Sequence, residues 1–331
     1  MVVWLVNEEQ HLIQLIELAR QSPFRTTPNP KVACRIIDSL GRVIAEGVHG
    51  ESGIDHAEVI ALHKAGDLAR GATAIVTLEP CAHQGKTPPC TDALIAAGVA
   101  RVIYGSSDRS QARGGAHILR NAKIEVIANV CESEADALIT PWRYFLETGL
   151  PYVTLKIAST LDGYVAAENS SSRWITGADA REYVHRLRAS VDAVAVGSGT
   201  AAIDDPLLDV RLPGNWPQPA RYVIGKRELA ASMRLSGLAT QIKTHDPREV
   251  LQEMAKDGVQ HLLLEGGPTT ATAFLKAGLV QQVVWCIAPK LLGSGVHAIG
   301  DLGFNDISQA EEWRVQRSWQ AGADLIIELT R

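Results

Sequence analysis

The sequence lacks the features that mark membrane and secreted proteins. No stretch reaches the roughly eighteen consecutive apolar residues that a membrane span needs. The apolar residues 1–6 run directly into Asn7-Glu8-Glu9 and have no basic segment before them, so they do not resemble a secretion signal. The cysteines are scattered and odd in number, which argues against a disulfide framework. They are Cys34, Cys81, Cys90, Cys131 and Cys286. We therefore expect a cytoplasmic protein with reduced thiols and no membrane partner.

The sequence also has no excess of positive charge. Its 32 Lys and Arg stand against 37 Asp and Glu, giving a net charge of −5, so we expect no nucleic-acid partner. With 46% hydrophobic and 21% charged residues, the composition is that of an ordinary globular protein. A chain of 331 residues is long for one core and sufficient for two domains. This composition favours a protein that acts on small molecules.

One group of residues indicates chemistry. His56-Ala57-Glu58 is followed by Pro80-Cys81 and then by Cys90, the order that zinc-dependent nucleobase deaminases use. A catalytic zinc takes three protein ligands and leaves a fourth position open, and His56, Cys81 and Cys90 supply three. Glu58 then remains to move protons. The usual signature has two residues between its cysteines, whereas residues 82–89 make an eight-residue insert here.

The same segment has a purely structural interpretation. Asp55 and Glu58 could form a capping box at the start of a helix, and Pro80 suits the first turn of a second helix with Cys81 near its positive end. A structural zinc is a further alternative, because structural sites take four ligands and His83 could be the fourth. Two cysteines around a Gly/Pro-rich loop, downstream of His-x-Glu, nevertheless favour a catalytic zinc site.

Strand and helix patterns alternate along the chain and predict α/β layers in two domains. Gly149-Leu150-Pro151 provides a boundary, which gives domains of residues 1–148 and 149–331. Predicted helices are Asn7–Arg20 (with Asn7 and Gln10 as a cap pair), His56–Ala65, Thr91–Ala97, 132–148, Ala178–Ala189, Pro247–Lys256 and Thr269–Ala277. Predicted strands are Lys31–Ile37, Arg42–Val48, Ala72–Leu78, Arg101–Tyr104, Tyr152–Ala158, Val191–Gly197, Arg221–Ile224, His261–Leu264, Val283–Ala288 and Asp324–Leu329.

The second half shows binding loops and no metal motif. Gly197-Ser198-Gly199-Thr200 and Gly266-Gly267-Pro268-Thr269-Thr270 each follow a predicted strand, where open α/β sheets bind ligands. Glycines let the backbone approach a phosphate, although such turns are also common for geometric reasons, and no G-x-G-x-x-G is present. Glu265 stands at a strand end beside the second loop.

Three arginines are natural anchors for a phosphorylated substrate. They are Arg181, Arg188 and Arg211. The alternative for Arg181 and Arg188 is a solvated helix face, and Arg211 could simply pair with the acidic residues between 204 and 209.

These motifs together identify a resemblance. Over essentially its full length the chain resembles the bifunctional deaminase–reductases of riboflavin biosynthesis. The matching segments are Thr27-Pro28-Asn29-Pro30, His56-Ala57-Glu58-Val59, Thr77-Leu78-Glu79-Pro80-Cys81, Thr87-Pro88-Pro89-Cys90, Leu155-Lys156, Leu161-Asp162-Gly163, Trp174-Ile175-Thr176, Asp204-Asp205-Pro206, Glu265-Gly266-Gly267-Pro268-Thr269 and Ala288-Pro289-Lys290-Leu291-Leu292-Gly293.

The resemblance implies a cytidine-deaminase-like three-layer domain followed by a dihydrofolate-reductase-like α/β domain. The first would hydrolyse the ring amine of 2,5-diamino-6-(5-phosphoribosylamino)pyrimidin-4-one with zinc. The second would use NADPH to reduce the ribosyl group, giving 5-amino-6-(5-phosphoribitylamino)uracil. The expected partners are this small phosphorylated pyrimidine and further copies of the chain in a homo-oligomer.

The resemblance also assigns residues. Zinc falls on His56, Cys81 and Cys90, and proton transfer falls on Glu58. NADPH contacts fall on Ala158, Trp174, Thr200, Asp204, Gly267, Pro268, Thr269, Thr270, Ala271, Thr272 and Ala273. Substrate contacts fall on Ser172, Arg188, Leu208, Arg211 and Glu265.

Three segments depart from the family pattern. Asp108-Arg109-Ser110-Gln111 replaces Asp-Pro-Asn-Pro, Val32-Ala33 replaces Val-Gly, and Gly225-Lys226 replaces Asp and a small hydroxyl residue. The first two lie in the deaminase half and the third on the cofactor side of the reductase half. An alternative function is a working deaminase whose reductase domain has drifted in specificity. Another is a non-catalytic module in which the second domain only senses a nucleotide.

Overall fold

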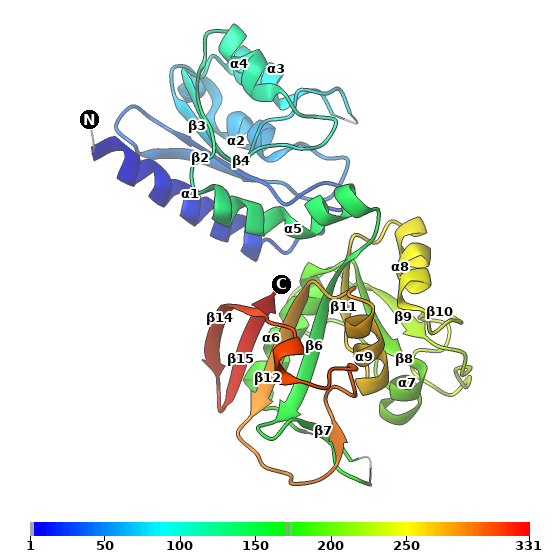
Figure 1. Ribbon diagram of the computed structural model, residues 1–331. Coiled ribbons are helices and arrows are strands. Elements are labelled where there is room, and N and C mark those ends of the chain that lie inside the picture. The colour runs from blue at the N-terminus through cyan, green and yellow to red at the C-terminus, as the bar shows by residue number, and fades with distance from the viewer. Residues whose placement is uncertain (1–2, 86, 170, 173) are drawn as a thin grey trace. The chain divides into compact units, whose positions relative to one another are not determined.

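The computed structural model describes residues 3–85, 87–169, 171–172 and 174–331, so Lys86 in the cysteine loop and Arg173 beside Trp174 lie outside the described residues. The chain forms two compact units, Met1–Glu147 and Thr148–Arg331. Each has its own sheet, covered by helices of its own unit (Figure 1).

The first unit is a three-layer α/β domain. Its helices are α1 (Val3–Gln21), α2 (Ala57–Ala65), α3 (Cys90–Ala97), α4 (Gly115–Asn121) and α5 (Glu132–Thr148), with a 3₁₀ turn at Gly66–Ala69. Its strands are β1 (Ala33–Ile37), β2 (Val43–Val48), β3 (Thr73–Leu78), β4 (Arg101–Ser106) and β5 (Glu125–Ile127), in the order β2-β1-β3-β4-β5. The pairs β3–β4 and β4–β5 are parallel, and β1 is antiparallel to both of its neighbours.

Helices cover both faces of this sheet, which explains why β1 is buried along its whole length. Side chains alternate between the faces along a strand. Cys34 and Ile36 pack with residues of α2, α3 and α4, whereas Ala33 and Ile37 pack with residues of α1 and α5. In Figure 1, α1 and α5 lie on one side of the sheet and α2, α3 and α4 on the other. The loops that follow the central strands β1, β3 and β4 therefore start from an enclosed part of the sheet.

The second unit contains a larger mixed sheet. Its strands are β6 (Tyr152–Thr160), β7 (Tyr164–Ala166), β8 (Ala193–Gly197), β9 (Ala220–Ile224), β10 (Thr240–Ile242), β11 (His261–Leu264), β12 (Gln282–Ala288), β13 (Val296–His297), β14 (Arg314–Ala321) and β15 (Asp324–Thr330). Its helices are α6 (Ala178–Ser190), α7 (Ser198–Asp204), α8 (Pro247–Lys256) and α9 (Pro268–Lys276), with a 3₁₀ turn at Ile307–Gln309.

Eight of these strands form one sheet in the order β10-β9-β8-β11-β6-β12-β15-β14, and β7 pairs with β13. The strands from β10 to β12 are parallel, so their carboxyl ends lie along one edge. The last two strands, β15 and β14, are antiparallel additions. In α6, Ala180 and Val184 are buried against β12 and β15. Open α/β sheets bind ligands at the edge formed by these carboxyl ends, and most of the predicted reductase residues lie there.

Three local predictions are wrong. The first helix begins at Val3 and not at Asn7, so Asn7 and Gln10 lie inside it and form no cap pair. His56, and not Asp55, is the residue that caps α2, and its side chain makes no capping hydrogen bond. Pro80 and Cys81 lie in a loop, because the next helix begins only at Cys90, with Pro89 as its N-cap.

Candidate active sites

The three predicted zinc ligands come together from three elements. His56 precedes α2, Cys81 follows β3, and Cys90 is the first residue of α3. Nδ1 of His56 lies 3.3 Å from Sγ of Cys90 and 3.7 Å from Sγ of Cys81. Zinc bonds of about 2.1 Å to nitrogen and 2.3 Å to sulfur in a tetrahedron would place N and S about 3.6 Å apart. The three ligand atoms all lie within 4.8 Å of one another, so the geometry fits zinc.

The cysteines differ in their surroundings. Sγ of Cys81 accepts the backbone N–H of Cys90 at 3.3 Å. Hydrogen bonds from Cys90 and His56 lower the pKa of the Cys81 thiol to about 4, although burial opposes this. The pKa of the buried Cys90 thiol is raised, first because it donates to Cys81 and then because of burial. A thiolate of low pKa is the form that binds a metal ion.

Glu58 is buried beside these ligands without belonging to the metal-binding group that the described residues form. Burial is the main reason that the pKa of Glu58 rises to about 7, and the negative charge of Cys81 adds to it. A carboxyl group with a pKa near neutrality can both accept and release a proton at physiological pH. His83 is exposed and lies outside the same group of described residues, so it provides no fourth ligand of a structural zinc.

Several residues without an earlier assignment surround His56. The buried ring of His49 lies edge-on to the His56 ring, with ring centroids 5.1 Å apart. Asn29 Nδ2 is 3.1 Å from Nε2 of His49, and the Thr87 hydroxyl is 3.4 Å from Nε2 of His56. Asn29 and Thr87 belong to the segments that match the family, so a signal for these two was present in the sequence.

Glu79 connects the cysteine loop to the rest of the unit. Its buried carboxylate accepts backbone N–H groups from Asp108 at 3.2 Å and from Ala116 at 3.0 Å. The first of these bonds falls in the segment that departs from the family pattern, and the second lies at the start of α4. The turn that carries Cys81 is thus fixed by long-range contacts.

In the second unit, Arg188, Glu265 and Lys156 form a buried ion cluster near the carboxyl ends of the parallel strands. Arg188 donates to both carboxylate oxygens of Glu265, at 2.6 and 3.0 Å, and also to the carbonyl of Asp209 at 3.0 Å. Lys156 Nζ is 3.8 Å from Glu265. The side chains of Arg188, Glu265 and Lys156 are 12%, 9% and 18% exposed, so Arg188 does not lie on a solvated helix face.

The charges in this cluster decide the protonation of Glu265. Burial would raise the pKa of its carboxyl group, but the positive charges of Arg188 and Lys156 outweigh burial and lower it to about 2. Glu265 is therefore a permanent carboxylate at neutral pH. It can accept a hydrogen bond from a ligand hydroxyl group.

The two glycine-containing loops pack reciprocally. A Cβ built on Gly197 would stand 2.5 Å from Oγ1 of Thr270, and one built on Gly267 would stand 2.5 Å from Oγ1 of Thr200. Each loop thus inserts a threonine into the space left by a glycine of the other. The predicted cofactor residues Thr200, Gly267 and Thr270 lie side by side for this reason.

The remaining predicted residues take several positions. Ala158 lies in β6, Leu208 is buried with a left-handed backbone (φ 55°), and the Ser172 hydroxyl lies 3.4 Å from a carboxylate oxygen of Asp204. Thr272 Oγ1 donates to the Pro268 carbonyl. Pro268, Thr269, Thr270, Ala271, Thr272 and Ala273 all belong to the first part of α9.

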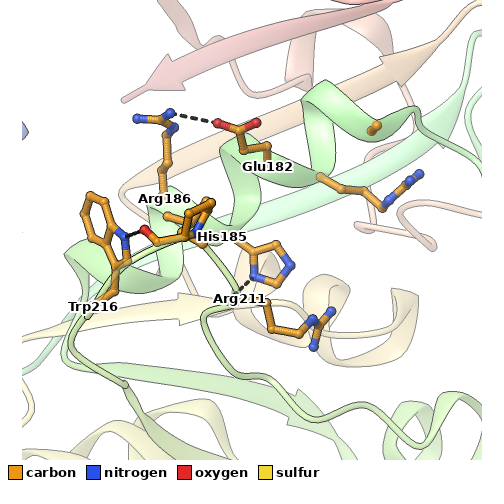
Figure 2. A pocket seen from close by; sticks show the side chains of 9 residues that line it. Glu182, His185, Arg186, Arg211 and Trp216 are labelled. Atoms are coloured by element: carbon orange, nitrogen blue, oxygen red, sulfur yellow. Dashed lines mark hydrogen bonds and ion pairs between the residues drawn. The ribbon is translucent and has the colours of Figure 1, made fainter.

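A cavity of about 540 Å³ lies between α6 and the segment 211–216 (Figure 2). Its cationic lining includes Arg181, Arg186 and Arg211, with His185 close to Arg211. Arg186 is paired with Glu182 at 2.7 Å, and Arg211 forms an ion pair with Asp209. Arg211 therefore pairs with an acidic neighbour and also lines the cavity, and its role as a phosphate anchor stays a prediction.

The fold and the two sites define a class of protein, a zinc-dependent deaminase joined to a reductase domain. The model of the cytidine and deoxycytidylate deaminase zinc-binding region matches residues 6–106, and that of the RibD C-terminal domain matches residues 151–327. The chain belongs to the RibD family of riboflavin biosynthesis. It is an enzyme with zinc deaminase and NADPH-dependent reductase activities.

Relatives match along nearly the whole chain. The chain is 42% identical to the riboflavin biosynthesis protein RibD of Mycobacterium tuberculosis (strain CDC 1551 / Oshkosh), covering 95% of this chain and 94% of the relative. Identity to RibD of Escherichia coli (strain K12) is 36%, covering 98% and 99%. The solved structure of Acinetobacter baumannii RibD, form 1, has a TM-score of 0.89 and 36% identity, covering 98% of this chain and 99% of that one.

A deaminase/reductase from Thermotoga maritima has a TM-score of 0.88 and 31% identity, again covering 98% and 99%. The two family models together cover both halves of the chain, which favours neither a drifted reductase nor a non-catalytic module. Among the described residues, no helix is long and apolar enough to cross a membrane.

Proposed function

We propose that the first unit hydrolyses the ring amine of 2,5-diamino-6-(5-phosphoribosylamino)pyrimidin-4-one, and that the second reduces the ribosyl group of the resulting uracil to ribityl. The family membership supports both reactions. The observation that carries the proposal is the convergence of His56, Cys81 and Cys90 beside the buried Glu58.

In the deaminase, His56, Cys81 and Cys90 hold zinc, which supplies an activated water when it is bound. Glu58 accepts a proton from the attacking water and donates it to the departing amine. The raised pKa of Glu58 suits both transfers. Burial of Glu58 also keeps bulk water away from the proton it carries.

In the reductase, NADPH carries the hydride and the protein supplies positioning. We assign the cofactor to Ala158, Trp174, Thr200, Asp204 and residues 267–273, around the reciprocal loops. We assign the sugar to Ser172, Leu208 and Glu265, because the Glu265 carboxylate can orient a hydroxyl group. Arg188 holds Glu265 in place through its two hydrogen bonds to that carboxylate.

We assign the substrate phosphate to the cavity beside α6, with Arg211 as its main anchor. Arg181 and Arg186 line the same cavity, so three arginine side chains face one volume. A phosphate monoester carries close to two negative charges and accepts several hydrogen bonds. It can therefore draw Arg211 away from Asp209.

The test is a two-readout assay. Purified zinc-loaded protein is incubated with the diaminopyrimidine phosphate, with and without NADPH, and ammonia release and NADPH oxidation are followed separately. We expect ammonia release without NADPH, and NADPH oxidation only after deamination. Ammonia release with no NADPH oxidation would overturn the reductase assignment. The absence of both signals would overturn both assignments.

We also infer that the enzyme is a cytoplasmic homo-oligomer. β14 is the last strand of its sheet, so one row of its backbone N–H and C=O groups lacks a neighbouring strand within the described chain. Val315 and Leu325 are exposed in this strand pair. A reducing cytoplasm keeps Cys81 and Cys90 available for zinc. Light scattering on purified protein measures the oligomeric state, and a monomer would contradict the inferred homo-oligomer.

A further inference from the structure

One matching segment, Ala288-Pro289-Lys290-Leu291-Leu292-Gly293, has no role in the assignments above. Its lysine reaches across to a cofactor residue. Nζ of Lys290 donates to the backbone carbonyl of Trp174 at 2.9 Å and to that of Ile175 at 2.7 Å. One ammonium group thus fixes two successive carbonyls, which a neutral side chain with a single donor could not do.

Two more charged side chains hold the same short segment. Arg181 donates to the Thr176 carbonyl at 2.7 Å, and a carboxylate oxygen of Asp324 accepts the Gly177 N–H at 2.6 Å. The backbone from Trp174 to Gly177 is therefore held by Lys290, Arg181 and Asp324, which come from three different parts of the unit. Such a segment has little freedom to choose another conformation.

The result is an indole ring presented to solvent. The Arg181 guanidinium lies 4.5 Å from the centre of the Trp174 ring, yet Trp174 remains 65% exposed. Trp174 is thus a large aromatic side chain that stays exposed while its backbone is held in place. A cavity of about 350 Å³ adjoins it, lined in part by Trp174, Arg181, Pro289 and Lys290.

The turn that carries Lys290 is held in place by a second matching segment, Leu161-Asp162-Gly163. The Leu161 N–H donates to the Lys290 carbonyl at 2.8 Å. The Asp162 carboxylate accepts the N–H groups of Leu292 at 2.9 Å and Gly293 at 2.7 Å. Both ends of the lysine's own turn are thus tied to the strand end at Thr160–Asp162.

We propose that Lys290 is a positioning residue for NADPH: it fixes the Trp174–Ile175 backbone so that the indole ring is preorganised to receive a flat ring of the cofactor. The inference rests on the proposed contact between Trp174 and NADPH. Preorganisation spares the cofactor the cost of ordering this segment on binding. Loss of Lys290 should then weaken cofactor binding with little effect on the chemical step.

The test compares Lys290→Met, Lys290→Arg and the exposed control Lys256→Met in the full-length, zinc-loaded enzyme. We expect Lys290→Met to raise the Kd and the KM for NADPH about tenfold, with kcat at saturating NADPH changed less than about twofold. Lys290→Arg should restore most of the affinity, because arginine can also donate to two carbonyls. Lys256→Met should bind NADPH normally, and ammonia release should be unchanged in all three.

A double-mutant cycle with Trp174→Ala separates the inference from the proposed function. If Lys290 acts through Trp174, the double variant Trp174→Ala/Lys290→Met should bind NADPH no more weakly than Trp174→Ala alone. Additive losses, or an unchanged Kd in Lys290→Met while Trp174→Ala weakens binding, would overturn the inference. An unchanged Kd in Trp174→Ala would instead overturn the proposed contact of Trp174, on which the inference rests.

Discussion

Gly115 lies directly against the backbone of Pro80: a Cβ built on Gly115 would stand 1.8 Å from the Pro80 carbonyl oxygen. The contact joins the start of α4 to the turn that carries Cys81. No rotation of a side chain can relieve it, because the colliding atom belongs to the backbone. The zinc site therefore depends on a residue far from it in sequence.

Gly115→Ala is expected to displace the Pro80–Cys81 turn and to release at least about half of the zinc, with a stability loss of about 3 kcal/mol or more. Metal analysis and thermal unfolding measure the two effects. Gly85→Ala is the matched control, because a Cβ on Gly85 meets no atom within 4 Å. Full zinc content in Gly115→Ala would show that the Pro80–Cys81 turn can shift without loss of zinc binding.

Glu58→Gln is expected to abolish ammonia release while zinc stays bound, because Glu58 transfers protons and is not a ligand. The variant should still oxidise NADPH when it is given the deaminated uracil. Ammonia assays and metal analysis on one preparation decide the matter. Deamination at nearly the wild-type rate would refute the role of Glu58.

Cys81→Ser and Cys90→Ser are each expected to lose most of the zinc, because an alcohol is a much weaker ligand than a thiolate. The control is the half-buried Cys131→Ser, which should keep its zinc, since Cys131 lies outside the metal-binding group found among the described residues. Full zinc occupancy in both ligand variants would mean that zinc binds elsewhere.

Acid should destabilise the second unit through Glu265. Its folded-state pKa of about 2 lies below the ordinary value of 4.5, so its stabilising contribution is complete above about pH 4.5 and is lost as the pH falls toward 2. The lost contribution amounts to about 3 kcal/mol. The difference in urea unfolding free energy between wild type and Glu265→Gln should therefore shrink from pH 6 to pH 3. A constant difference over this range would refute the coupling.

The loop after β9 offers a test of cofactor preference. Lys226 and Arg227 are exposed, and Gly225 lies beside Ser198 and His245. If Lys226 meets the 2′-phosphate of NADPH, Lys226→Glu should raise the KM for NADPH about tenfold, or roughly 1.4 kcal/mol, with NADH little affected. Lys256→Glu controls for net charge. An unchanged NADPH/NADH preference in both Lys226→Glu and Arg227→Glu would leave this loop a solvated turn.

The sequence predicted those parts of the molecule that depend on local patterns. Buried strands such as β3 and β11 are apolar runs between turn signals, and the zinc ligands stand in a short, ordered motif. By contrast, β14 is exposed along nearly all of its length, so it has no apolar alternation to reveal it. The start of α4 could not be predicted either. Gly115 has a low helix propensity, and glycine is needed there because the Pro80 carbonyl leaves no room for a Cβ.

The contacts that orient the sites could not be predicted either. Glu79 to Ala116, Arg188 to Glu265 and Lys290 to Trp174 each join residues that are distant in the chain. Their partners are set by how strands are ordered in the sheets, which a single sequence does not state. For the reductase, the resemblance to the family named the residues. Only the fold showed which of them contact one another.

The interlocking of Gly197 with Thr270 and of Gly267 with Thr200 constrains how this enzyme can change. A Cβ added at Gly197 or Gly267 would collide with a threonine hydroxyl of the other loop, so such a substitution requires a smaller side chain at Thr270 or Thr200. If the two loops hold NADPH as we propose, engineering a new cofactor preference here requires changing both loops together.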